Sequence, residues 1–182
     1  PAPVDSFVGR ERELAEVRGL VEDPAARLVT LVGGGGMGKT RLALEVARAC
    51  LPAFAGGAWI VDLAPLAAGT PATSALAAGA SSAAGGVLRL PVEEQSTAVA
   101  HAITSGLEVF EADKAAGLQG LLGSLASALE GSPLLLLLDG CEPVVEGAVP
   151  VVAQLLARCP ELTVLATSRE ALRMSGEHLY EL

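Results

Sequence analysis

One stretch of the sequence has the residue types and spacing needed to hold a phosphate group. Residues 33–40 read Gly-Gly-Gly-Gly-Met-Gly-Lys-Thr and match the G-x-x-x-x-G-K-[ST] pattern of a P-loop. Glycines let the backbone turn tightly and approach a phosphate closely. The N–H groups and the positive end of a following helix would then face the anion. The pattern therefore predicts a nucleotide site in which Lys39 meets the β- and γ-phosphates and Thr40 ligates Mg²⁺.

The segments around this loop fit the same interpretation. Residues 28–32 before it have the character of a short buried strand, and residues 41–48 after it have apolar side chains at helical spacing. A glycine-rich turn could match the pattern by chance, but the strand and the helix favour a P-loop. We expect the nucleotide to be contacted by Lys39 and Thr40 together with Gly34, Gly35, Gly36, Met37, Gly38 and Arg41.

A second candidate for the site is Asp139, which follows five consecutive leucines. A continuous apolar run between chain-breaking residues is typical of a central parallel strand. A carboxylate at the carboxyl end of such a strand, beside a P-loop, can hold Mg²⁺ directly or through water. The alternative is an aspartate that begins a turn with Gly140, and the upstream P-loop favours the metal role. The predicted metal residues are therefore Thr40 and Asp139.

Arg169 is the third candidate, two residues after a predicted strand over residues 162–167. In a parallel sheet, the end of this strand would share an edge with the P-loop and Asp139. A guanidinium group at that edge can bind the γ-phosphate, because its planar set of N–H donors matches phosphate oxygens. A surface or helix-capping role fits the local sequence equally well. The predicted catalytic set is Lys39, Asp139 and Arg169.

The remaining chain alternates between strand and helix patterns, which favours an α/β fold with a parallel sheet. Beyond the strands already named, the sequence predicts strands over residues 58–63 and 178–182. It predicts helices over residues 10–21, 71–80, 92–105, 118–129 and 142–158, the last divided near Gly147 and Pro150, and one helical turn at 171–174. We therefore expect a P-loop NTPase fold, a three-layer sandwich with a central parallel sheet and helices on both faces.

Composition limits the possible partners. The chain of 182 residues is long enough for one domain, and its net charge of −9 opposes direct binding to nucleic acid or to an anionic membrane. The three cysteines lack metal-ligand spacing, which favours buried thiols in a reducing cytoplasm. No apolar run approaches the ~20 residues of a membrane-spanning helix. Because the chain begins at Pro1 without Met, we expect residues 1–182 to form one nucleotide-binding domain of a longer, multidomain protein.

Several motifs occur together in an order that resembles a known family. The segments are residues 7–11, 33–43, 61–66, 134–142 and 166–170. Together they resemble the NB-ARC-like ATPase module of STAND-class signalling ATPases, in particular the module of bacterial SARP-type and large LuxR-type transcriptional regulators. The resemblance implies that Val8, Gly9 and Arg10 border the adenine pocket. It also implies ATP/ADP and Mg²⁺ as ligands, an ADP-bound resting state, an ATP-bound self-assembling state, and neighbouring DNA-binding and sensor domains.

The sequence departs from this family at Gly140, where an Asn or Asp usually follows the metal-binding aspartate. Glycine supplies no side chain to orient water, so we expect slow ATP hydrolysis unless Glu142 takes over. Two other functions remain open, an ordinary P-loop kinase or fast hydrolase and a degenerate scaffold. The scarcity of cations between residues 64 and 130, where only Arg89 and Lys114 occur, argues against a kinase lid. The intact Lys39, Thr40 and Asp139 argue against a scaffold.

Overall fold

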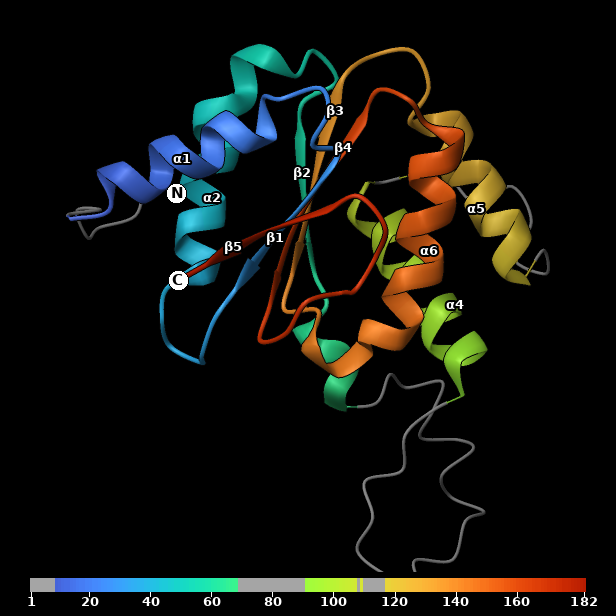
Figure 1. Cartoon of the computed structure of the whole chain (residues 1–182). Helices are drawn as coiled ribbons and strands as arrows, with labels where there is room; N and C mark the ends of the chain where they lie inside the picture. Colours follow the sequence, from blue (N-terminus) through green and yellow to red (C-terminus); the bar gives the residue numbers. More distant parts are fainter. Residues whose placement is uncertain (1–8, 69–90, 108, 110–116) are drawn as a thin grey trace, which may run out of the picture.

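A parallel sheet of five strands forms the centre of the molecule (Figure 1). The computed structural model describes residues 9–68, 91–107, 109 and 117–182. The strands are β1 (Leu28–Val32), β2 (Ala58–Asp62), β3 (Leu134–Asp139), β4 (Leu162–Ser168) and β5 (Glu177–Glu181). They lie in the order β2-β3-β4-β1-β5, and every neighbouring pair is parallel.

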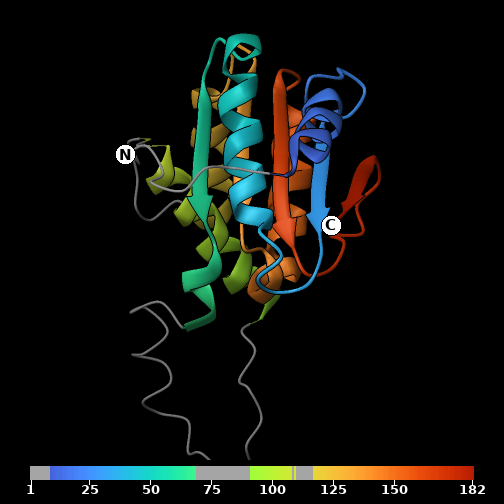
Figure 2. The same cartoon turned by 90° about the vertical axis from the view of Figure 1, so that its left-hand side faces the viewer.

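Helices cover both faces of this sheet. On one face lie α1 (Glu11–Val21) and α2 (Lys39–Cys50), which stand in front of the strands in Figure 2. On the other face lie α4 (Val92–Gly106), α5 (Gly117–Ala128) and α6 (Val145–Arg158) (Figure 1). Three short 3-10 helices complete the described elements: η1 (Leu51–Ala53), η2 (Ala64–Ala68) and η3 (Glu142–Val144). The three-layer α/β sandwich expected from the sequence is confirmed.

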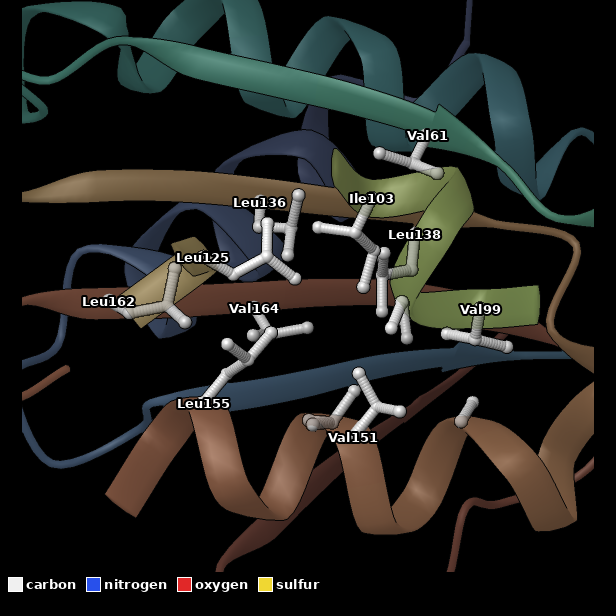
Figure 3. Close-up of a cluster of buried hydrophobic side chains, with 14 of the residues drawn as sticks. Val61, Val99, Ile103, Leu125, Leu136, Leu138, Val151, Leu155, Leu162 and Val164 are labelled. Carbon is white, nitrogen blue, oxygen red and sulfur yellow. The ribbon is translucent and has the colours of Figure 1, made fainter. Parts of the chain in front are cut away.

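The leucine run of β3 explains why this strand lies inside the sheet. Leu134, Leu136 and Leu138 belong to the core beneath α4, α5 and α6, whereas Leu135 and Leu137 belong to the core beneath α1 and α2. Figure 3 shows the first core, in which Leu136 and Leu138 share one cluster with Ile103 of α4 and Leu155 of α6. A strand buried on both faces needs apolar residues at every position, not at alternate ones.

The other element predictions are largely confirmed. Each predicted strand is present, and the helices predicted over residues 10–21, 41–48, 92–105 and 118–129 have ends that differ by two residues at most. The helix predicted over residues 71–80 lies outside the described residues. None of the helices in the described part of the chain is both long and apolar enough to cross a membrane.

The predicted division of the helix after Cys141 is wrong. The chain forms η3 and then α6, which continues without interruption through Gly147 and Pro150. Pro150 removes one backbone hydrogen bond, but the buried face of α6 keeps the helix on the sheet. Gly147 serves a different purpose, because α4 crosses α6 so closely there that a side chain would collide with it.

The helical turn predicted at residues 171–174 is also wrong. The carboxylate of Glu177 accepts hydrogen bonds from the backbone N–H groups of Leu172, Arg173 and Met174, at 2.9, 2.7 and 3.2 Å. Arg173 adopts a left-handed conformation with φ of 61°, which no helical turn contains. The contact with Glu177, three to five residues further along the chain, therefore determines the backbone of this connection.

A side-chain hydrogen bond ties the edge strand β5 to α1. The Tyr180 hydroxyl donates to Glu16 Oε2 at 2.6 Å, and Arg12 Nε donates to Glu16 Oε1 at 2.7 Å. The bond from Tyr180 and then the bond from Arg12 lower the pKa of Glu16. Burial and then the bond to Glu16 raise the pKa of Tyr180 to about 12.

We expect the phenol of Tyr180 to ionise with an apparent pKa of about 12 in the folded protein, against about 10 in urea. Since the folded pKa is the higher one, the stabilisation from this group is complete below pH ~10 and is lost as the pH rises toward 12. Tyr180 is the only tyrosine in the chain, so ultraviolet absorbance of the phenolate measures it alone.

The control for this titration is Glu16→Gln, which keeps an acceptor but removes the negative charge. The pKa of Tyr180 should fall toward its ordinary value in this variant, because the carboxylate is one of the groups that raise it. A folded wild-type protein whose tyrosine ionises near pH 10 would contradict the contact between β5 and α1.

Candidate nucleotide-binding site

The candidate site lies at the carboxyl edge of the sheet, the lower edge in Figure 2. β1 ends at Val32, directly before the glycine loop, while β3 ends at Asp139 and β4 ends at Ser168. Parallel strands place their carboxyl ends on one edge, which is where open α/β sheets bind ligands. The strand order puts β4 between β1 and β3, so the end of β4 lies between the glycine loop and Asp139.

The glycine loop delivers the amino end of α2 to this edge. Gly36 and Gly38 have φ of 78° and 81°, a left-handed conformation that strongly favours glycine. Among the described residues, no side chain caps the amino end of α2, and its first turn contains no acidic residue. The N–H groups and the positive end of the helix dipole are thus available to an anion.

Lys39 is folded into the loop. Its side chain is buried, and its ammonium nitrogen lies 2.8 Å from the carbonyl oxygens of both Gly33 and Gly34. The Met37 sulfur lies across the same loop and accepts a hydrogen bond from the Gly34 N–H at 3.0 Å. The carbonyl oxygens of the loop are therefore hydrogen-bond partners of its own cation.

Asp139 is the centre of a hydrogen-bonded group. Its Oδ1 accepts from the hydroxyl of Thr40 at 2.8 Å and from the hydroxyl of Thr167 at 2.5 Å. The Thr167 oxygen in turn accepts from the N–H of Gly140 at 2.9 Å. The structure thus brings Thr40 and Asp139 together as expected, and it adds Thr167, a buried residue that the sequence analysis missed. A polar residue near the end of the strand before Arg169 was the available signal.

The oxygens of Thr40 and Asp139 fit Mg²⁺ but do not form a complete cage. Mg²⁺ prefers oxygen ligands and commonly takes one or two from protein, the rest from water and phosphate. Within the described ranges, no group of three or more His, Cys, Asp and Glu residues could hold a metal ion. The nearby thiol of Cys141 is unsuitable, because burial raises its pKa to about 12.

The structure also explains why glycine follows Asp139. Gly140 has φ of 71°, and a Cβ there would lie 3.1 Å from the Cβ and 3.3 Å from the nitrogen of Ala64. An Asn or Asp at this position would be strained and crowded against η2.

A second carboxylate, Asp62, lies opposite Asp139 in the sheet, and its Oδ1 accepts a hydrogen bond from the Ala64 N–H at 3.0 Å.

Arg169 reaches the glycine loop from the end of β4. Its Nη2 lies 3.8 Å from the position that a Cβ of Gly35 would occupy. Its Nε lies 3.4 Å from Glu142 Oε1, which forms an ion pair at the same edge. The helix-capping alternative is excluded because residues 169–174 form no helix. The structure therefore brings Arg169 to the loop.

The residues expected around adenine are placed only in part. Val8 lies outside the described residues, while Gly9 and Arg10 directly precede α1. The N–H of Gly9 lies 3.4 Å from a Glu11 carboxylate oxygen, and α1 packs against α2. Arg41 lies in the first turn of α2. The adenine role of Val8, Gly9 and Arg10 stays a prediction.

Comparison with known proteins finds relatives among mycobacterial sequences. An uncharacterized protein of Mycobacterium tuberculosis is 33% identical over 172 residues, which represent 94% of this chain and 35% of that protein. A candidate HTH-type transcriptional regulator of the same species is 34% identical over 156 residues, which represent 83% of this chain and 13% of that protein. The chain thus spans about a third or less of these relatives.

Two solved structures share the fold of this chain. A Signal Transduction ATPase with Numerous Domains (STAND) from Pyrococcus horikoshii, with a tetratricopeptide repeat sensor, has a TM-score of 0.54 at 17% identity, covering 100% of this chain and 24% of that one. Cdc6p from Pyrobaculum aerophilum has a TM-score of 0.59 at 12% identity, and the match covers 99% of this chain and 47% of that chain.

The sequence profile of the AAA ATPase domain matches residues 6–167. The chain therefore belongs to the AAA ATPase domain family.

Proposed function

We propose that the chain is the ATP/ADP-binding switch module of a larger transcriptional regulator, of the NB-ARC-like type found in SARP-type and large LuxR-type proteins. The observation that carries the proposal is the convergence of the uncapped amino end of α2, the Thr40–Asp139 pair and Arg169 at one sheet edge. Membership of the AAA ATPase domain family and the relative named as a candidate HTH-type regulator support it.

In this proposal, each group at the edge acts on a different part of the nucleotide. The loop N–H groups bind the β-phosphate, and Lys39 reaches the β- and γ-phosphates after leaving the carbonyl oxygens of Gly33 and Gly34. Thr40 and Asp139 hold Mg²⁺, which would neutralise phosphate charge. Arg169 binds the γ-phosphate, and residues 8–10 border the adenine. Gly34, Gly35, Gly36, Met37, Gly38 and Arg41 complete the contacts.

Hydrolysis is slow in this proposal because two carboxylates near Thr40 and Asp139 already have hydrogen-bond or ion-pair partners and are not positioned to activate water. Asp62 accepts a backbone hydrogen bond from Ala64, and Glu142 pairs with Arg169. Gly140 contributes no polar group. We therefore expect turnover on the order of a few per minute or less, against roughly 10 per second for a typical enzyme.

The switch would act through other domains of the same protein. ATP binding would favour self-association, and regulation of DNA would require domains outside this chain, since a net charge of −9 opposes contact with nucleic acid. The module would work in the cytoplasm, where both ATP and the target genes of the proposed regulator are found. The small share of the mycobacterial relatives that the chain covers is consistent with such an arrangement.

The test of the proposed switch is Arg169→Ala. We expect it to weaken ATP binding by about ten-fold or more, because a charge-assisted bond contributes roughly 1.5–3 kcal/mol. ADP binding should change little, since ADP lacks the γ-phosphate. Calorimetric titration with Mg²⁺ and either ADP or a non-hydrolysable ATP analogue measures both affinities.

The control is Arg173→Ala, which removes a cation from the same connection. Arg173 is exposed and pairs with Glu170 at 3.7 Å. This variant should keep the wild-type preference between the two nucleotides. Equal losses of ATP and ADP affinity in Arg169→Ala would show that Arg169 supports the shape of the site and does not distinguish the nucleotides.

A further inference from the structure

Arg169, the proposed ligand of the γ-phosphate, forms an ion pair with Glu142. The Glu142 carboxylate would therefore compete with the γ-phosphate for Arg169. The two side chains approach to 3.4 Å between Arg169 Nε and Glu142 Oε1. Lys39 is also engaged, but its partners are neutral carbonyl oxygens of Gly33 and Gly34. Arg169 thus has a charged partner where Lys39 has neutral ones, so moving Arg169 to a phosphate requires breaking an ion pair.

The carboxylate is the more firmly placed member of this pair. Glu142 begins η3, between the buried residues Cys141 and Val144. The N–H of Cys141 donates to the carbonyl oxygen of Thr167 at 2.9 Å, which ties this turn to the end of β4. The Arg169 side chain is 71% exposed, against 29% for Glu142. A rearrangement would therefore move the guanidinium group more readily than the carboxylate.

We infer that Glu142 is a specificity-determining residue that holds Arg169 back and so limits the preference of the site for ATP over ADP. This inference rests on the proposed role of Arg169 at the γ-phosphate. A carboxylate and a phosphate compete for the same planar set of N–H donors. This competition opposes ATP and leaves ADP largely untouched, because ADP lacks the γ-phosphate.

Glu142→Gln tests the inference, because it removes the charge and keeps the size of the side chain. We expect ATP-analogue affinity to rise by about two- to five-fold, the range for an exposed ion pair, with ADP affinity unchanged. The gain should shrink as salt is raised from 0.05 M toward ~1 M, because ions screen exposed charges. Calorimetric titrations of the chain with Mg²⁺ and each nucleotide provide these values, and thermal unfolding shows that each variant is folded.

The matched control is Glu170→Gln, which removes a negative charge beside Arg169. Glu170 is exposed and pairs with Arg173, so this variant should not alter the preference. In an Arg169→Ala background, Glu142→Gln should give no gain, because its effect passes through Arg169. A structural role for Glu142 would instead change ADP and ATP binding equally and would persist in that background.

Each remaining outcome has a definite meaning. If Arg169→Ala alters the nucleotide preference but Glu142→Gln leaves it unchanged, Glu142 does not restrain Arg169. If Glu142→Gln weakens ATP-analogue binding, Glu142 orients Arg169 toward the phosphate, and the inference is wrong in sign. If Arg169→Ala leaves the preference intact, the proposed switch itself fails.

Discussion

Replacing Lys39 with alanine is expected to weaken the binding of both ADP and ATP by about thirty-fold or more. Both nucleotides carry the β-phosphate that Lys39 would contact, and loss of a charge-assisted bond costs about 2 kcal/mol or more. The loop N–H groups remain, so some affinity should persist. Calorimetric titration with each nucleotide measures the loss, which should be large for both, unlike that of Arg169→Ala, which should spare ADP.

The structure provides a control within the same helix. Arg48 lies in the last turn of α2, is partly exposed and pairs with Glu45, so Arg48→Ala removes one positive charge far from the loop. It should leave nucleotide affinity within about two-fold of wild type, because charges beyond the Debye length are screened. Lys39→Ala should also stay folded, since the carbonyl oxygens of Gly33 and Gly34 can turn to water. Unchanged affinity in a folded Lys39→Ala protein would contradict the assignment of the loop.

The parts of the site that could be predicted are those that depend on neighbouring residues in the sequence. Lys39 and Thr40 belong to one short motif, and Asp139 ends an apolar run whose burial follows from its composition alone. Thr167 is polar and lies near the end of a predicted strand, but its contact with Asp139 depends on β4 lying next to β3. A sequence pattern predicts parallel strands but does not give their order.

The error at residues 171–174 has a different origin, a side-chain contact that helical periodicity does not reveal. Residues 171–174 have a plausible helical composition, yet the Glu177 carboxylate binds the N–H groups of that segment from outside it. The ion pair between Arg169 and Glu142, in contrast, joins two segments that are distant in sequence. Helices and strands follow from local periodicity, whereas contacts between distant segments depend on the packed structure.

Gly147 shows most clearly how a local signal can mislead. A glycine within a helical pattern suggests a break, because glycine lowers helix propensity. In the structure, Gly147 lies buried inside α6 at its crossing with α4. A Cβ at this position would lie 2.4 Å from Gln95 Cβ, 2.6 Å from the Gln95 carbonyl carbon and 2.8 Å from the Ser96 nitrogen. Two of these three atoms belong to the backbone of α4, so no side-chain rotation can relieve the contact.

We therefore expect Gly147→Ala to lower the free energy of unfolding by about 3 kcal/mol, the upper part of the range for overpacked cores. For a domain of this size, that loss corresponds to a decrease in Tm of roughly 6–12 °C. Thermal and urea unfolding followed by circular dichroism measure the change. Nucleotide affinity, measured below the transition, should change less than in Lys39→Ala, because α4 and α6 pack on the sheet face opposite α2.

Gly123→Ala is the matched control, because it makes the same substitution inside a neighbouring helix. Gly123 lies in α5, and a Cβ there would meet no described atom within 4 Å. Alanine is the better helix former by about 1 kcal/mol, so this variant should be as stable as wild type or slightly more stable. The difference between the two variants then isolates the crossing of α4 and α6 from helix propensity. Equal unfolding temperatures for Gly147→Ala and Gly123→Ala would show that the two helices do not approach as closely as the structure indicates.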